Sequence, residues 1–161
     1  MTKEKTETVF GLYADMVYRI CFMYFKNSPH DIEDAVSSVF MKYLEHDSPF
    51  ENSEHEKAWL ITTAQNTCRS TLRHWWRKKT VSLDEITELS SSDSPPFEIS
   101  ELMSAVLALP EKQRNAVYLY YYEDYTAEQI AKMYYVSTNT VYGWLAKGRK
   151  RLKKALNRDV L

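Results

Sequence analysis

Apolar residues recur every three or four positions along most of the chain, which is the spacing of helices that bury one face. The first stripe predicts a helix over residues 9–24. The next predicts a helix over residues 28–46, because Ser28 suits the N-cap, Pro29 the first turn and Asp31 the positive helix end. With only 3 Gly and 5 Pro in 161 residues, composition also favours helices over strands, and we expect an all-α fold.

A long helix is predicted over residues 54–79, with Ser53 and Glu56 as a reciprocal cap at its start. Its apolar stripe reaches two adjacent tryptophans, Trp75 and Trp76, of which one is expected in the core and the other outside. The opposite surface begins polar and becomes basic toward the end of the helix. Its members are Asn66, Arg69, Arg73, Arg77, Lys78 and Lys79.

Residues 81–98 interrupt the helical pattern with consecutive serines, a Pro-Pro pair and acidic side chains, which is typical of a flexible linker. We therefore predict two small helical domains, at residues 1–80 and 99–161, joined by this acidic linker. In the second domain Pro110 begins a helix. The residues expected to face inward from it are Ala116, Val117, Tyr120 and Tyr121.

The end of the chain has the layout of a helix-turn-helix: a short helix over residues 127–134, a tight turn, and a longer helix from Ser137 to about residue 157. Thr126 and Gln129 form a capping box for the short helix. The outward residues at the start of the longer helix suit base edges in a major groove, and the six cations between Lys147 and Lys154 suit phosphates. An αα-hairpin with a solvated basic end has the same periodicity and stays open at this point.

The net charge of −1 conceals an alternation of sign along the chain. Residues 1–57 hold 6 basic and 11 acidic residues, and residues 58–80 hold 5 basic and none acidic. Residues 81–101 hold 6 acidic and none basic, and residues 102–161 hold 10 basic and 5 acidic. Two basic blocks separated by an acidic one indicate two contacts with a polyanion, although ordinary solvated faces would also produce this pattern.

Several classes of protein do not fit the sequence. No apolar run approaches the length of a membrane span and no signal peptide opens the chain, so neither membrane insertion nor export is expected. Cys21 and Cys68 both lie in apolar stripes and are expected to be reduced core residues. The four histidines are scattered and no phosphate-binding loop or nucleophile elbow is present, so we expect no catalytic residues, no metal and no cofactor.

The second domain resembles the promoter-distal domain of bacterial sigma factors of the extracytoplasmic-function (ECF) type. The matching positions are Leu109, Pro110, Arg114, Ile130, Ala131, Ser137, Thr140, Val141, Leu145, Arg149 and Leu152. In the first domain, HDIEDAVSSVFMKYLEH resembles the family's polymerase-binding helix, and EKAWLITTAQNTCRSTLRHWWRKK resembles its helix for minus-ten recognition and promoter melting. The resemblance covers nearly the whole chain, with both domains in the family's order.

This resemblance implies a cytoplasmic sigma factor that directs core RNA polymerase to specific promoters and assists promoter melting. It also implies an anti-sigma factor as partner, which in this family can be anchored in a membrane. The residues implied in core polymerase binding are Asp31, Glu33, Asp34, Ser37, Phe40 and Lys42, although core packing is an equally direct explanation of Phe40.

The resemblance also implies two sets of DNA contacts. For the minus-ten element these are Phe50 and Asn52, in the loop where the family captures a flipped base, and Asn66, Arg69, Arg73, Trp76 and Arg77 on the long helix. For the minus-35 element they are Thr138, Asn139, Tyr142 and Gly143 at base edges, with Ser137, Thr140, Lys147, Arg149 and Arg151 on the backbone.

Three positions depart from the family's pattern. Ser37 stands where Gln is frequent, Ser70 where Asp is frequent, and Tyr135 where the turn usually has Gly. A left-handed Tyr costs about 1 kcal/mol, and a shifted turn would avoid that cost. Two other functions remain open on the residues alone: a helix-turn-helix regulator that binds an operator as a homodimer without polymerase, and a helical adaptor that binds only protein.

Overall fold

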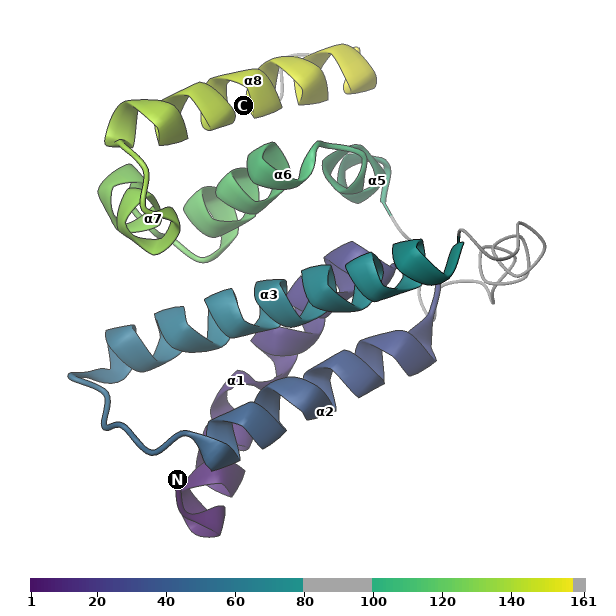
Figure 1. The fold of residues 1–161 in the computed structure, drawn as a ribbon. Coiled ribbons are helices and arrows are strands. Elements are labelled where there is room, and N and C mark those ends of the chain that lie inside the picture. Colours follow the sequence, from purple (N-terminus) through teal and green to yellow (C-terminus); the bar gives the residue numbers. More distant parts are fainter. Residues whose placement is uncertain (80–99, 158–161) are drawn as a thin grey trace. The chain divides into compact units, whose positions relative to one another are not determined.

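The computed structural model describes residues 1–79 and 100–157, which fall into two compact units, each treated by itself below (Figure 1). All regular structure in these residues is helical, which confirms the predicted all-α fold. The predicted linker, residues 81–98, lies outside the described residues.

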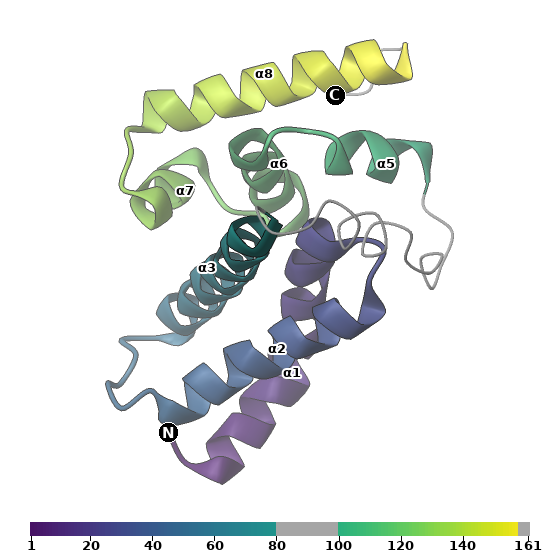
Figure 2. The same cartoon turned by 45° about the vertical axis from the view of Figure 1, so that its right-hand side comes forward.

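The first unit consists of three helices: α1 (Lys3–Phe25), α2 (Pro29–Glu45) and α3 (Ser53–Lys79). Each of them packs against the other two, and Figure 2 shows α1 and α2 lying side by side. The residues that fill the space between them have no exposed surface: Val17, Ile20, Cys21, Ile32, Val39, Tyr43, Leu60, Ile61, Ala64 and Cys68. The three predicted helices are therefore confirmed, and their apolar stripes form one shared core.

The helix caps of this unit differ in part from the prediction. Ser28 is the N-cap of α2, but its hydroxyl donates to the Asp31 carboxylate and caps no backbone N–H. At the start of α3 the predicted cap, Ser53, is wrong because Ser53 already lies inside the helix. The Asn52 side-chain oxygen accepts from the His55 N–H at 2.8 Å instead, and Asn52 is among the best N-cap residues.

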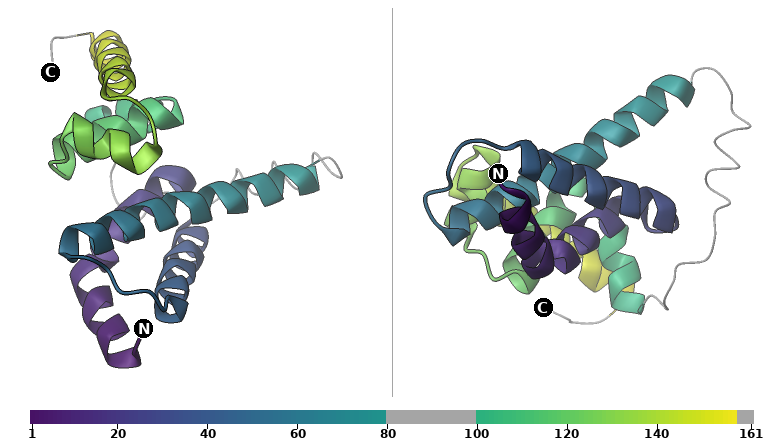
Figure 3. Two further views of the ribbon diagram at one scale, coloured as in Figure 1. Left: turned by 60° about the vertical axis from the view of Figure 1, so that its left-hand side comes forward. Right: turned by 90° about the horizontal axis from the view of Figure 1, so that it is seen from below.

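The second unit contains α5 (Glu101–Leu107), α6 (Glu111–Val117), a π-helical turn η1 (Tyr118–Tyr122), α7 (Ala127–Tyr134) and α8 (Thr138–Leu156). The last helix packs along α5, α6 and α7 (Figure 3). Its inward residues Val141, Leu145 and Leu152 are at most 1% exposed, and Ile130 on the neighbouring α7 is also fully buried. This unit is thus organised around one face of α8.

The prediction that Tyr120 and Tyr121 face inward is wrong, because the chain leaves the α-helical phase at η1. The Glu123 N–H donates to the Tyr118 carbonyl at 3.2 Å, which is the i to i+5 bond of a π turn. The wider turn leaves Leu119 fully buried, whereas Tyr120 and Tyr121 are 36% and 43% exposed.

The helix-turn-helix is present as predicted. The Thr126 N–H donates to the Gln129 side chain at 2.8 Å and the Gln129 N–H donates to the Thr126 hydroxyl at 3.1 Å, which confirms the capping box. The turn is not shifted: Tyr135 adopts the left-handed conformation itself, with φ 55° and ψ 43°. The Val136 N–H then closes the helix end on the Ala131 carbonyl at 3.0 Å.

Gly148 is a packing position that periodicity did not reveal. A Cβ atom built there would lie 2.8 Å from the Val117 Cγ2 atom, which is closer than real carbon contacts allow. The absence of a side chain at Gly148 therefore sets how closely α8 approaches α6. Gly143 on the same helix has nothing within 4 Å of a Cβ position, so it is not needed for packing.

Candidate functional site

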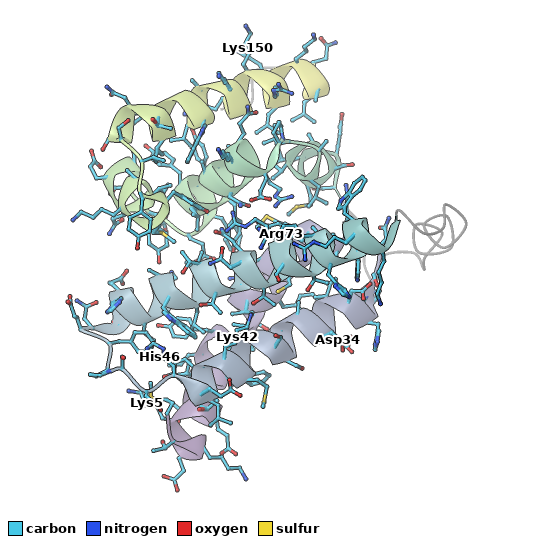
Figure 4. All side chains as sticks on the ribbon, in the orientation of Figure 1. Lys5, Asp34, Lys42, His46, Arg73 and Lys150 are labelled. Carbon is cyan, nitrogen blue, oxygen red and sulfur yellow. The ribbon has the colours of Figure 1, made fainter. Side chains whose placement is uncertain are left out.

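The outward face of α2 is acidic and polar. Glu33, Asp34 and Ser37 are exposed, and the Asp34 carboxylate lies 3.3 Å from His30 one turn earlier (Figure 4). Asp31 is half-buried, because its carboxylate accepts the hydrogen bond from Ser28. An exposed row of carboxylates of this kind suits a basic protein surface rather than DNA.

The apolar member of this face is Met41 and not Phe40. Phe40 is only 6% exposed, and its ring lies edge-on to Phe10 with 4.9 Å between ring centroids. Met41 is 55% exposed and follows Asp34 by seven residues and Ser37 by four, so all three share one side of the helix. Sequence reasoning missed Met41, although Met41 falls outside the apolar stripe of α2 and lies four residues after Ser37, a spacing that could have indicated its position on this face.

Lys42 links α2 to α3. Its Nζ atom donates to the Thr67 hydroxyl at 2.8 Å, although the residue as a whole remains exposed (Figure 4). This hydrogen bond holds the side chain against the neighbouring helix. Lys42 therefore stabilises the surface around it as well as contributing a charge.

An aromatic cluster holds the segment between α2 and α3. The Phe50 ring stacks on His46 with 4.8 Å between centroids and meets Trp59 edge-on at 5.7 Å. Tyr43 lies beneath it, and the Tyr43 hydroxyl donates to the Glu56 carboxylate at 2.8 Å. Burial, together with that hydrogen bond, raises the pKa of the Tyr43 phenol above its usual range. Phe50 is thus half-buried against side chains of α2 and α3, which hold the loop in place.

A polar and cationic stripe runs along α3. Asn66, Arg73 and Arg77 are exposed and recur at helical spacing, and Arg73 is labelled in Figure 4. Arg69 is half-buried and donates to the Asn66 side-chain oxygen at 2.5 Å, so these two predicted DNA contacts are held together. The stripe presents a continuous basic edge along α3.

The two tryptophans at the end of α3 divide as expected. Trp75 packs on Phe25 with 5.3 Å between ring centroids, whereas Trp76 is 65% exposed. The spacing of apolar residues could not show which of these two adjacent tryptophans is buried. In the structure the rotation of α3 places Trp75 against the core. Trp76 follows Arg73 by three residues, so it lies at the edge of the basic stripe and offers a flat surface on which a base can stack.

The start of α8 presents the predicted minus-35 set in two groups. Ser137 is the N-cap: its hydroxyl accepts from the Thr140 N–H at 3.1 Å and lies 2.9 Å from the Thr140 hydroxyl. These two side chains therefore stabilise the start of the helix. Asn139 and Tyr142 are exposed, with Tyr142 at 48%. Thr138 and Gly143 are half-buried beside them.

The cations of α8 follow two to four turns later. Lys147 and Arg151 are exposed, and Lys150 extends away from the helix in Figure 4. Arg149 is half-buried, because its guanidinium donates to the Tyr121 hydroxyl at 3.1 Å. Charged groups along one helix that begins with short polar side chains have the arrangement expected of a recognition helix.

Other kinds of site find no support in the described residues. Within residues 1–79 and 100–157, no three His, Cys, Asp or Glu side chains gather as metal ligands, and no helix is long and apolar enough to cross a membrane. Cys21 and Cys68 are buried free thiols, as predicted. The hydrogen bond with Cys68, together with burial, raises the pKa of the Cys21 thiol, which keeps it protonated and unreactive.

Comparison with known proteins assigns both units. The family model for Sigma-70 region 2 matches residues 9–78, and the model for Sigma-70, region 4 matches residues 99–152. The chain is also similar to the ECF RNA polymerase sigma factor SigM of Bacillus subtilis, with 28% identity over 96% of each chain. The chain belongs to the ECF sigma factors. The B. subtilis sigma factor SigV is a further relative, at 27% identity over 89% of this chain and 86% of its own.

Structural comparison agrees with this assignment at the level of the fold. The sigma factor RpoE of Bartonella quintana, solved in complex with the anti-sigma factor NepR, matches with a TM-score of 0.74 and 20% identity over 98% of this chain and 99% of its own. The α1–α3 unit therefore contains sigma region 2, and the α5–α8 unit contains region 4.

As an ECF sigma factor, the protein directs RNA polymerase to promoters in transcription initiation. Members of the family are initiation factors that do not themselves catalyse a reaction. The three positions at which this sequence departs from the family's pattern are all exposed: Ser37 lies on α2, Ser70 on α3, and Tyr135 directly after α7.

Proposed function

We propose that this ECF sigma factor divides its work among three helices. The outward face of α2, with Glu33, Asp34, Ser37 and Met41, would dock on a basic and partly apolar surface of core polymerase. Its carboxylates supply charge complementarity, and the half-exposed Met41 supplies apolar area that can adapt to a partner. Lys42 and Phe40 support this face through Thr67 and Phe10.

The stripe on α3 would meet the minus-ten element. Arginines and an exposed tryptophan on one side of a helix provide both cations for a backbone and a stacking surface for unpaired bases. Phe50 and Asn52 are held in place by the aromatic cluster and the α3 cap. The segment that carries them, at the N-terminal end of α3, therefore offers a fixed surface for a base that has left the duplex.

The observation that carries the minus-35 proposal is the helix-turn-helix, whose second helix opens with exposed short polar residues and continues with cations. Asn139 and Tyr142 would contact base edges. The phosphates would be contacted by the cations Lys147, Arg149 and Arg151. Domain limits at residues 1–80 and 99–161, with a linker over 81–98, accompany this proposal. Two DNA-binding units on one chain make the spacing of the two promoter elements part of the specificity.

We further propose that the protein works in the cytoplasm and is held inactive by an anti-sigma factor. The support is the likeness to RpoE, which was solved bound to the anti-sigma factor NepR.

Run-off transcription with core polymerase tests the docking face directly. Asp34→Arg, compared with Glu7→Arg on the exposed side of α1, reverses one charge in each case. Placing a cation against a basic partner surface should lower specific transcript by about tenfold or more, whereas Glu7→Arg should leave it unchanged. Equal transcription from both variants would exclude the α2 face. Sequence-specific operator binding without any polymerase-dependent transcript would instead indicate a homodimeric regulator.

A further inference from the structure

The π turn η1 places two tyrosines where an α-helix would not. The hydrogen bond from the Glu123 N–H to the Tyr118 carbonyl spans five residues, one more than in an α-helix. Within this wider turn, Tyr120 and Tyr121 are exposed. π turns are rare and occur frequently at functional sites, because they cost hydrogen-bond geometry that a purely structural helix would keep. The exposed tyrosine pair therefore calls for a functional explanation.

Tyr121 uses this placement to reach the recognition helix. Its hydroxyl accepts a hydrogen bond at 3.1 Å from Nη1 of Arg149, across 28 residues of sequence. The Tyr120 ring supports it edge-on, with 5.0 Å between ring centroids. The regular helical phase predicted from the sequence would place Tyr121 inward, whereas in the π turn its hydroxyl reaches Arg149.

Arg149 lies on the same side of α8 as the residues at the start of the helix that are proposed to face DNA. It follows Tyr142 by seven residues, which places both on the same side of the helix. A guanidinium has five N–H donors, and the contact with Tyr121 uses one of them. The remaining donors can still form a bidentate contact with a phosphate.

We propose that Tyr121 is a positioning residue for minus-35 DNA binding: its hydroxyl holds the Arg149 guanidinium in the orientation in which that group contacts a backbone phosphate. The proposal rests on the assignment of Arg149 to the DNA backbone made above. A free arginine side chain loses much rotamer freedom when it binds, and the bond to Tyr121 removes part of that freedom before DNA arrives.

The test uses holoenzyme assembled from core polymerase and the full chain. Its probe is a fluorescently labelled duplex carrying a promoter recovered by run-off transcription. Tyr121→Phe removes only the hydroxyl, and Tyr120→Phe is the matched control in the same turn. Tyr121→Phe should weaken binding about two- to tenfold, the range expected from immobilising one long side chain, whereas Tyr120→Phe should not. The slope of log affinity against log salt should be unchanged in both, because Arg149 keeps its charge.

Arg149→Ala tests separately whether Arg149 contacts the DNA backbone at all. It should weaken binding and reduce the salt slope by about one, since one phosphate contact is lost. If Arg149→Ala has no effect, Arg149 does not contact the backbone, and both statements fail. If Arg149→Ala weakens binding but Tyr121→Phe behaves like Tyr120→Phe, only the positioning role is overturned.

A double variant completes the design. Tyr121→Phe added to Arg149→Ala should cause no further loss, because the hydroxyl acts only through the guanidinium. Additive losses would show that Tyr121 contacts DNA or stabilises α8 independently, and would overturn the proposal. Amide hydrogen exchange over α8 should be the same in Tyr121→Phe and the parent protein, which distinguishes positioning from a loss of local stability.

Discussion

Gly143 and Gly148 lie on the same helix, yet alanine should affect them in opposite directions. In a helix interior Ala is favoured over Gly by about 0.8–1.0 kcal/mol, and this gain applies at both positions. At Gly143 nothing lies within 4 Å of the new Cβ atom, so Gly143→Ala should stabilise region 4 by nearly the full amount.

At Gly148 the new Cβ atom would lie 2.8 Å from Val117 Cγ2, which is about 0.7 Å short of the roughly 3.5 Å at which carbon atoms attract. Val117 is β-branched and cannot readily rotate away within a helix. Overpacking of this kind costs about 1–3 kcal/mol, so Gly148→Ala should be less stable than Gly143→Ala by about that amount. Both variants gain the same helix propensity from Ala. The difference in their stability therefore measures the cost of the overlap with Val117.

Hydrogen exchange read by mass spectrometry on the full chain provides the assay, because it reports α6 and α8 separately from region 2. Protection of α8 amides should rise in Gly143→Ala and fall relative to it in Gly148→Ala. Val117→Ala combined with Gly148→Ala should cost less than the sum of the single changes, since it removes the overlapping atom. Equal protection in the two glycine variants would refute the reasoning.

Three further predictions concern local features. Asn52→Ala should destabilise region 2 by about 1 kcal/mol in urea unfolding and Ser53→Ala by much less, because Asn52 is the observed cap; the reverse order would reinstate Ser53. Tyr135→Gly should stabilise region 4 by about 1 kcal/mol by relieving its left-handed conformation, whereas Tyr135→Ala keeps the strain and should not. Because the folded-state pKa of Tyr43 is raised, the stability that depends on its neutral phenol is complete below the unfolded value near 10 and is lost as pH rises above it. Tyr43→Phe should remove that part of the alkaline decline, and an identical pH dependence in both proteins would contradict the assignment.

Elements governed by nearby residues could be predicted from the sequence. The capping box at Thr126 and Gln129, the cap at Ser137 and the apolar stripes of α1–α3 all follow from residues within a turn or two of one another. The outward residues at the start of α8 followed from the same periodicity. This is why most candidate DNA contacts lie on exposed or half-exposed faces.

Features that depend on a partner elsewhere in the fold could not be predicted. Periodicity assumes a constant helical phase, so it placed Tyr121 in the core and gave no sign of its bond to Arg149. On α2 the family resemblance named Phe40 for polymerase binding, and the packing of Phe40 on Phe10 is what leaves Met41 as the exposed apolar residue of that face. The need for glycine at position 148 exists only once α6 lies against α8.

The cluster around Phe50 has a consequence for the energetics of promoter opening. A loop that orders only on meeting DNA must surrender its conformational entropy at that moment, at about 1–2 kcal/mol for each backbone residue fixed. Here the stack of His46, Phe50 and Trp59 orders the segment while the protein folds. The conformational entropy of this segment is therefore lost once, when the protein folds, and is not lost again each time transcription starts. We expect the heat capacity change of open-complex formation to report DNA unpairing and domain docking, with little contribution from folding of this loop.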